Sequence, residues 1–149
     1  MGVGKTTVGR LLARRLGRPF LDGDQQIEET TDRTGREIAA TDGVPALHAL
    51  ELSVLLQALE DSSDAVVAAA ASVVDRPAGR SAIAEATCIW IDRRPDESSG
   101  RGEDHRRDVG PDENLERRRP LFQDLADLVL SGPGDPEDYV KRALAYLHR

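Results

Sequence analysis

Two periodicities of hydrophobic and polar residues alternate along this chain. Val8, Leu11, Leu12 and Leu16 recur at the spacing of one helix face, and Gly17 follows them as a common stop residue. By the same criteria, helices are expected over residues 5–16, 25–31, from 34, after 43, and over 77–86, 115–123 and from 136 onward. The longest of them should bury one stripe of side chains: Leu47, Leu50, Val54 and Ala58.

Short apolar runs lie between these helices and predict strands at residues 19–21, 65–71, 87–92 and 128–130. The second run is apolar throughout, which is typical of a strand that is buried on both faces. Strands that alternate with helices indicate an α/β fold with a parallel sheet.

Length and charge limit the classes of function. A chain of 149 residues suggests one domain, and a net charge of −7 with a pI near 5.0 argues against a general nucleic-acid binder. The single Cys88 excludes an internal disulfide, so a cytoplasmic setting is the simplest interpretation. We identify no membrane-crossing stretch and no signal peptide. We therefore expect no nucleic-acid or membrane partners, and we expect the chain to be a monomer.

The first residues carry the most specific chemistry. Gly2, Val3, Gly4, Lys5, Thr6 and Thr7 match the end of the phosphate-binding pattern G-x-x-x-x-G-K-[ST]. Gly4 leaves room for a phosphate, and the N–H groups of residues 2–7 would surround it at a helix N-terminus. In this pattern Lys5 reaches the terminal phosphates of ATP, and the Thr6 hydroxyl binds Mg²⁺. The alternative is a glycine-rich N-terminal tail.

The pattern is incomplete at its start. Its first glycine would fall two residues before Met1, and the strand that should lead into the loop is absent from the printed sequence. Without that strand, the runs 65–71 and 87–92 would face each other across a gap. We expect the natural product to begin about ten residues earlier, with a strand of ordinary length. The alternative is a real truncation.

Several further motifs follow in a recognisable order, and together the chain resembles the shikimate kinase family. The similarity spans nearly the whole chain and is densest up to residue 43; it rests on residues 2–13, 16–24, 27–28, 34–38, 42–43 and 118–122. It implies a P-loop kinase with three α/β/α layers and a parallel sheet whose first strand is missing. It also implies transfer of the γ-phosphoryl group of ATP, with Mg²⁺, to a hydroxyl of shikimate.

The resemblance assigns roles to a pair of carboxylates. Asp22 would help to hold Mg²⁺, and Asp24 would accept a hydrogen bond from the acceptor hydroxyl. Residues i and i+2 of an extended segment point the same way, so both carboxylates are expected to face the phosphate site. The alternative is a solvated turn in which Asp caps the next helix.

Two arginines are assigned in the same way. Arg118 matches the arginine that holds the substrate carboxylate, and Arg107 lies in a segment, residues 93–114, that matches the mobile lid over the phosphates. The alternative for Arg117, Arg118 and Arg119 is a solvated helix face.

The sequence departs from the family at two acceptor-site positions. His48 replaces an arginine that grips the substrate carboxylate, and residues 69–71, which include Ala70, replace three glycines. The added methyl groups should crowd the site, and any of these positions with positive φ would be strained. Two alternatives therefore stay open: a non-catalytic nucleotide-binding relative, or a kinase for another small acid or sugar such as gluconate.

Overall fold

The computed structural model describes residues 4–62, 64–92 and 113–148. Helices and strands alternate through these ranges as predicted. In chain order the elements are α1 (Lys5–Leu16), β1 (Phe20–Asp22), α2 (Gly23–Thr31), α3 (Gly35–Asp42), α4 (Val44–Asp61), β2 (Val66–Ala68), the 3₁₀ helix η1 (Ala71–Asp75), α5 (Pro77–Ala84), β3 (Ile89–Asp92), α7 (Glu113–Leu125), β4 (Leu128–Ser131) and α8 (Pro136–Leu147).

The helix ends follow from local chemistry. Gly17 ends α1 in the left-handed conformation, with φ 67°, which glycine adopts without strain. Thr34 caps α3 by accepting a hydrogen bond from the Glu37 N–H at 3.1 Å. Asp135 caps α8 in a reciprocal capping box with Asp138. Because these caps depend on residues next to each helix, the sequence predicted the bounds of these helices closely.

The strands pair two by two, and both pairs are parallel. β1 pairs with β2, from Phe20 opposite Val66 to Asp22 opposite Ala68. β3 pairs with β4 over residues 89–92 and 128–131. Within the described ranges β2 and β3 are not hydrogen-bonded to each other, so the strands form two separate two-stranded sheets.

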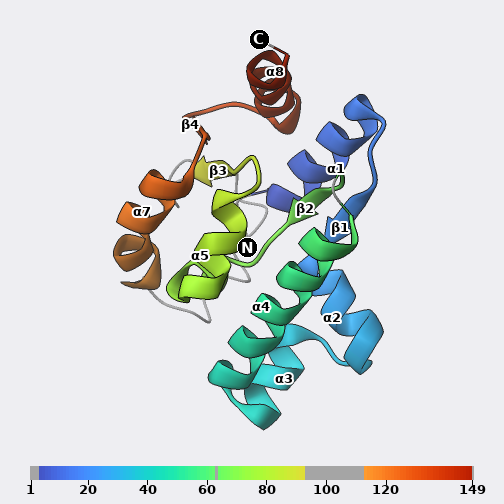
Figure 1. Ribbon diagram of the computed structural model, residues 1–149, viewed down its shortest axis with the longest axis vertical. Helices are drawn as coiled ribbons and strands as arrows, with labels where there is room; N and C mark the ends of the chain where they lie inside the picture. Colours follow the sequence, from blue (N-terminus) through green and yellow to red (C-terminus); the bar gives the residue numbers. More distant parts are fainter. Residues whose placement is uncertain (1–3, 63, 93–112, 149) are drawn as a thin grey trace.

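Two clusters of buried side chains hold the fold together. The first joins α1 and α8 to the β3–β4 pair; its buried members are Val8, Leu12, Leu130, Tyr139, Val140 and Ala143. The second joins α4 to η1 through Leu55, Val73 and Val74, with partly buried side chains of α5 and α7 packed around them. Figure 1 shows α8 at one end of the molecule and α2 and α3 at the other, with α5 beside α7.

The strand predicted over residues 65–71 is shorter than expected. β2 ends at Ala68, and Ala71 already begins η1. Its partner β1 ends at Asp22, which caps α2, so no paired backbone remains beyond Ala68. The prediction of a strand buried on both faces was also wrong, since Val66 and Val67 are half-buried.

The buried stripe predicted for α4 is confirmed at Ala58 and wrong at its other three positions. Leu52, Leu55 and Ala58 are buried, whereas Leu47, Leu50 and Val54 are half-buried. A single stripe assumes a single packing surface, but α4 contacts α2 and α3 on one side and η1 and α5 on another. The buried face therefore turns toward η1 and α5.

We predict that Gly79→Ala destabilises the protein. A methyl group on residue 79 would lie 2.0 Å from the Val73 carbonyl oxygen, where backbone cannot give way easily. Overpacking of this kind costs about 1–3 kcal/mol of unfolding free energy, measurable by urea denaturation. Gly35→Ala is the control, because its methyl group would lie 3.4 Å from the Leu47 side chain and should be tolerated. Equal stability of both variants would contradict the close packing of α5 on η1.

Candidate active site

The end of the phosphate loop opens α1. Gly4 adopts the left-handed conformation, with φ 79° and ψ 15°, and its carbonyl accepts the first helical hydrogen bond from the Val8 N–H at 2.9 Å. The first N–H groups of a helix have no intrahelical acceptor, and they lie at the positive end of its dipole. A left-handed residue followed by helical ones forms a concavity that binds anions. Gly2 and Val3 lie outside the described residues.

Lys5 is held against the end of β2 and does not extend into solvent. Its side chain is half-buried, and Nζ donates to the Ala69 carbonyl oxygen at 2.8 Å. The reason is that α1 packs against β2, which brings Lys5 over the end of that strand. Thr7, two residues later, is exposed.

Asp22 connects α1, β1 and α2. The Thr6 hydroxyl donates to Asp22 Oδ2 at 2.8 Å, and Oδ1 accepts the N–H groups of Asp24 at 2.9 Å and Gln25 at 3.4 Å. Only 8% of Asp22 is exposed. Asp22 therefore caps α2, as the alternative interpretation had it, but in a buried setting and not in a solvated turn.

Asp24 does not point the same way as Asp22, contrary to our prediction. α2 begins at Gly23, so Asp24 lies in the first turn of a helix and not in an extended segment. Asp22 is extended and caps the helix, whereas Asp24 lies inside its first turn, so the shared direction of strand residues i and i+2 does not apply to this pair. Asp22 is consequently buried while Asp24 is exposed.

A pocket lies where β1 and β2 end. Three polar side chains, Asp24, Gln26 and Glu51, contribute to its lining, which consists of Gly23, Asp24, Gln26, Glu51, Val54, Leu55, Val67, Ala68, Ala69 and Ala70. The side-chain oxygen of Gln26 is buried and lacks a hydrogen-bond partner within the described ranges. Such an atom is costly unless a ligand or water supplies a donor. The sequence analysis missed Gln26, although its place beside the buried Ile27 was a signal of burial.

Ala69 and Ala70 add their methyl groups to this pocket, as expected from the loss of glycine. Ala70 has φ −68°, and Asp32 is the only non-glycine residue with positive φ in the described ranges. The backbone strain that we considered for these positions is therefore absent there.

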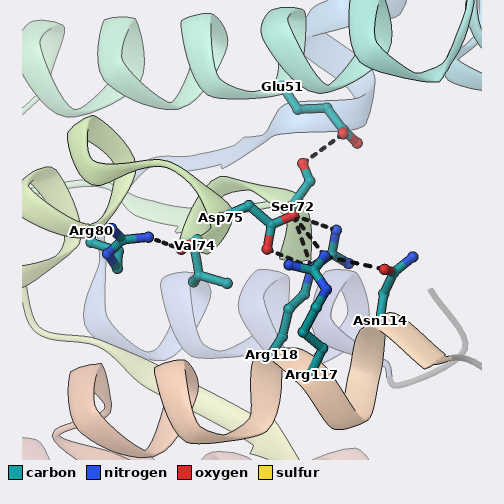
Figure 2. Close-up of polar contacts among 8 residues, drawn as sticks. All are labelled: Glu51, Ser72, Val74, Asp75, Arg80, Asn114, Arg117 and Arg118. Atoms are coloured by element: carbon teal, nitrogen blue, oxygen red, sulfur yellow. Dashed lines mark hydrogen bonds and ion pairs between the residues drawn. The ribbon is translucent and has the colours of Figure 1, made fainter.

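Arg118 of α7 reaches η1 (Figure 2). Its Nε lies 3.0 and 3.2 Å from the two carboxylate oxygens of Asp75, and Nη2 lies 2.8 Å from Oδ2. Only 7% of Arg118 is exposed, so it does not belong to a solvated helix face. The bonds from Arg118 hold the pKa of Asp75 below its usual value, and Asp75 is therefore an anion at neutral pH.

The remaining predicted residues lie apart from these contacts or outside the description. His48 is half-buried in α4, one turn before Glu51. Arg107 lies outside the described residues, as does the predicted lid from residue 93 to 112. Residues 113 and 114 begin α7, so the lid prediction extended too far at its C-terminal end. Ser72 and Asp75, which the sequence analysis also missed, lie on η1, and Ser72 donates to Glu51 at 2.8 Å.

No metal cluster of three or more His, Cys, Asp or Glu side chains occurs in the described part of the chain. In that same part, no helix combines the length and the apolar character that crossing a membrane requires. The site combines a loop for an anion with a pocket where the parallel strands β1 and β2 end, and the carboxylates of Asp24 and Glu51 line that pocket. This combination defines a P-loop kinase.

Comparison with known proteins gives the family. A family model described as shikimate kinase matches residues 1–148. The shikimate kinase of Symbiobacterium thermophilum is 40% identical over 75% of this chain and 67% of its own, and that of Corynebacterium efficiens is 31% identical over 98% and 91%. The structure of shikimate kinase from Acinetobacter baumannii in complex with shikimate superposes with a TM-score of 0.78, at 27% identity over 99% of this chain and 88% of that one. The chain belongs to the shikimate kinase family.

Some other curated shikimate kinases align over only about half of their own length, 49% and 48% in two cases.

The comparisons confirm the predicted family and fold class. At the level of the family they also confirm the predicted class of enzyme, a phosphotransferase with an alcohol acceptor. Membership implies ATP as the phosphoryl donor. The matches favour this activity over the two alternatives, a non-catalytic relative or a gluconate-type kinase.

We predict that Asp22→Ala destabilises the protein and that Asp24→Ala does not. Asp22 is buried and accepts three hydrogen bonds, whereas Asp24 is exposed. Loss of a helix cap alone costs about 0.5–2 kcal/mol. Thermal unfolding of both variants beside the parent measures the difference. A stable Asp22→Ala variant would contradict the role of Asp22 as the connection between the loop helix and α2.

Proposed function

We propose that this chain transfers the γ-phosphoryl group of ATP to a hydroxyl of shikimate, giving ADP and shikimate 3-phosphate. One observation carries the proposal. Lys5, the phosphate-loop lysine, contacts the carbonyl of Ala69, and Ala69 lines the same pocket as Asp24. The group that would bind the transferred phosphate and the group that would bind the accepting hydroxyl therefore belong to one site.

The nucleotide side consists of the loop and its helix. The N–H groups of residues 2–7, with Gly2, Val3, Gly4, Thr6 and Thr7 among them, would bind the β- and γ-phosphates at the positive end of α1. Lys5 would leave the Ala69 carbonyl for the γ-phosphate, where it offsets the charge of the transition state. Arg107 would contribute a second positive charge from its segment.

The Thr6 hydroxyl and the Asp22 carboxylate fit a magnesium ion. Both are hard oxygen ligands, and their oxygens are 2.8 Å apart. Mg²⁺ generally takes only one or two protein ligands beside phosphate oxygens and water, so a pair without a larger acidic cluster is sufficient. When bound, the ion neutralises charge on the phosphates.

On the acceptor side, Asp24 would orient the attacking hydroxyl and take its proton as the oxygen–phosphorus bond forms and the bond to ADP breaks. Arg118 and His48 would face the acceptor carboxylate, and Ala70 would contact the ring. We expect the enzyme to act as a cytoplasmic monomer without nucleic-acid or membrane partners.

The test is the release of ADP from ATP and Mg²⁺, with shikimate or gluconate as the acceptor. Release that requires shikimate supports the proposal. Calorimetric titrations with ATP and with shikimate separate the two sides of the site. Binding of ATP without turnover of shikimate would contradict the proposed activity.

We predict that Lys5→Ala abolishes turnover and leaves the fold intact, because only the lysine's charge and one hydrogen bond to Ala69 are lost. Lys141→Ala is the matched control, since Lys141 is exposed on α8 and should not affect turnover. Both variants are compared by ADP release and by circular dichroism. Unchanged ATP affinity in Lys5→Ala would mean that the phosphate loop is assigned wrongly.

We predict that His48→Arg raises kcat/KM for shikimate. An arginine at this position offers the acceptor carboxylate a forked, permanently charged donor, worth about 1.5–3 kcal/mol. The effect should be larger when Ala69, Ala70 and Ala71 are also changed to glycine. His148→Arg, at the exposed end of α8, adds the same charge away from the site and is the control. No gain from His48→Arg would show that the carboxylate binds elsewhere.

A further inference from the structure

The guanidinium of Arg118 already binds a carboxylate in this molecule. Nε and Nη2 both donate to Asp75, in the forked arrangement with which arginine recognises a ligand carboxylate. Arg117 also contacts Asp75, with Nη2 at 3.4 Å from Oδ2. Asp75 thus occupies the Nε–Nη2 edge of the guanidinium, one of the forked edges that a carboxylated acceptor would use.

The Asp75–Arg118 pair is connected to the proposed acceptor pocket through η1, whose Ser72 donates to the pocket residue Glu51. Ala70 lines the pocket, and η1 begins at the next residue. Side chains three residues apart in a 3₁₀ helix lie on the same side, about 6 Å apart along its axis. Ser72 and Asp75 therefore form one polar row, which Figure 2 shows between Glu51 of α4 and the arginines of α7.

The charges around the pocket are unfavourable for an anion. Asp24 and Glu51 both line it, and both are acidic. A carboxylated ligand would need a cation there, and Arg118 is neutralised by Asp75 across a distance of 2.8 Å. An anion that is to bind Arg118 through its Nε–Nη2 edge must therefore displace Asp75.

We propose that Asp75 is a specificity-determining residue that competes with the carboxylate of the acceptor for Arg118. The proposal rests on the proposed function in one respect, namely that Arg118 faces the acceptor. Its consequence is selective, because competition weakens the binding of carboxylated acceptors and leaves the binding of uncharged ones unchanged.

Asp75→Asn tests this inference, since it removes the competing charge and keeps the shape of the side chain. The probes are shikimate and its methyl ester, which lacks the negative charge, titrated by calorimetry into the full chain. We expect the Kd of shikimate to fall at least fivefold and the Kd of the ester to stay within twofold. An unchanged or higher Kd for shikimate overturns the proposal, and so does equal tightening of the ester.

The chain offers a matched control one residue along α7. Arg119 donates to Asp92 at 2.7 Å, and this second arginine–aspartate pair joins α7 to the end of β3 and not to η1. Asp92→Asn removes the same kind of charge and should change neither Kd. If Asp92→Asn tightened shikimate binding as much as Asp75→Asn, the effect would come from the change in net charge alone. That result would overturn the proposal.

A double variant keeps the test decisive if Asp75→Asn alone does not fold. Asp75→Asn with Arg118→Gln removes both charges together and leaves no unpaired buried ion. If Asp75 already occupies Arg118, this variant should bind shikimate within twofold of the parent. A loss of tenfold or more would show that Arg118 binds the acceptor despite Asp75, which overturns the proposal.

Turnover and binding separate this inference from the proposed function. Tightened shikimate binding without ADP release would support competition by Asp75 and contradict the kinase activity. ADP release by the parent, without tighter shikimate binding in Asp75→Asn, would support the kinase activity and contradict competition by Asp75. Absence of shikimate binding in every variant, Asp75→Asn included, overturns the inference.

Discussion

The site depends on one buried carboxylate. Asp22 accepts the hydroxyl of Thr6 from α1 and two N–H groups from the start of α2, so one side chain fixes the phosphate-loop helix, the end of β1 and the next helix together. Because these bonds satisfy both oxygens, the buried charge is tolerated. The same bonds start α2 at Gly23, which turns Asp24 out of the interior and into the pocket lining.

The second constraint is the balance of charge along η1. Ser72 binds Glu51 and Asp75 binds Arg118, so this short helix connects α4 to α7 through polar side chains while Val73 and Val74 pack into the core beside it. Breaking such a buried pair by removing one partner is costly, because the other charge is left unmatched. A ligand that used Arg118 would therefore have to replace the bonds that Asp75 provides.

Local signals in the sequence were sufficient for much of the fold. The first helix was predicted with the bounds it has, because its apolar face and its terminal glycine lie within adjacent turns. The starts of the helices near residues 34 and 136 were predicted for the same reason, and in the structure Thr34 and Asp135 cap them. The prediction failed for β2 and for the buried face of α4, where the outcome depends on partners that are distant in sequence. The residues named for the nucleotide and the acceptor stay predictions, since Gly2, Val3 and Arg107 lie outside the described ranges and no ligand contact tests the others.

The sequence by itself determined the phosphate-binding pattern, the alternation of strands and helices, and the shikimate kinase family, because these are recorded in residues a few positions apart. The tertiary structure decided where the charges go. Lys5 reaches Ala69 across 64 residues, and Arg118 reaches Asp75 across 43. Neither contact has a local signature, since an arginine beside other arginines resembles a solvated surface until a buried aspartate is brought against it. The packing of α1 on β2 and of α7 on η1 creates these two contacts.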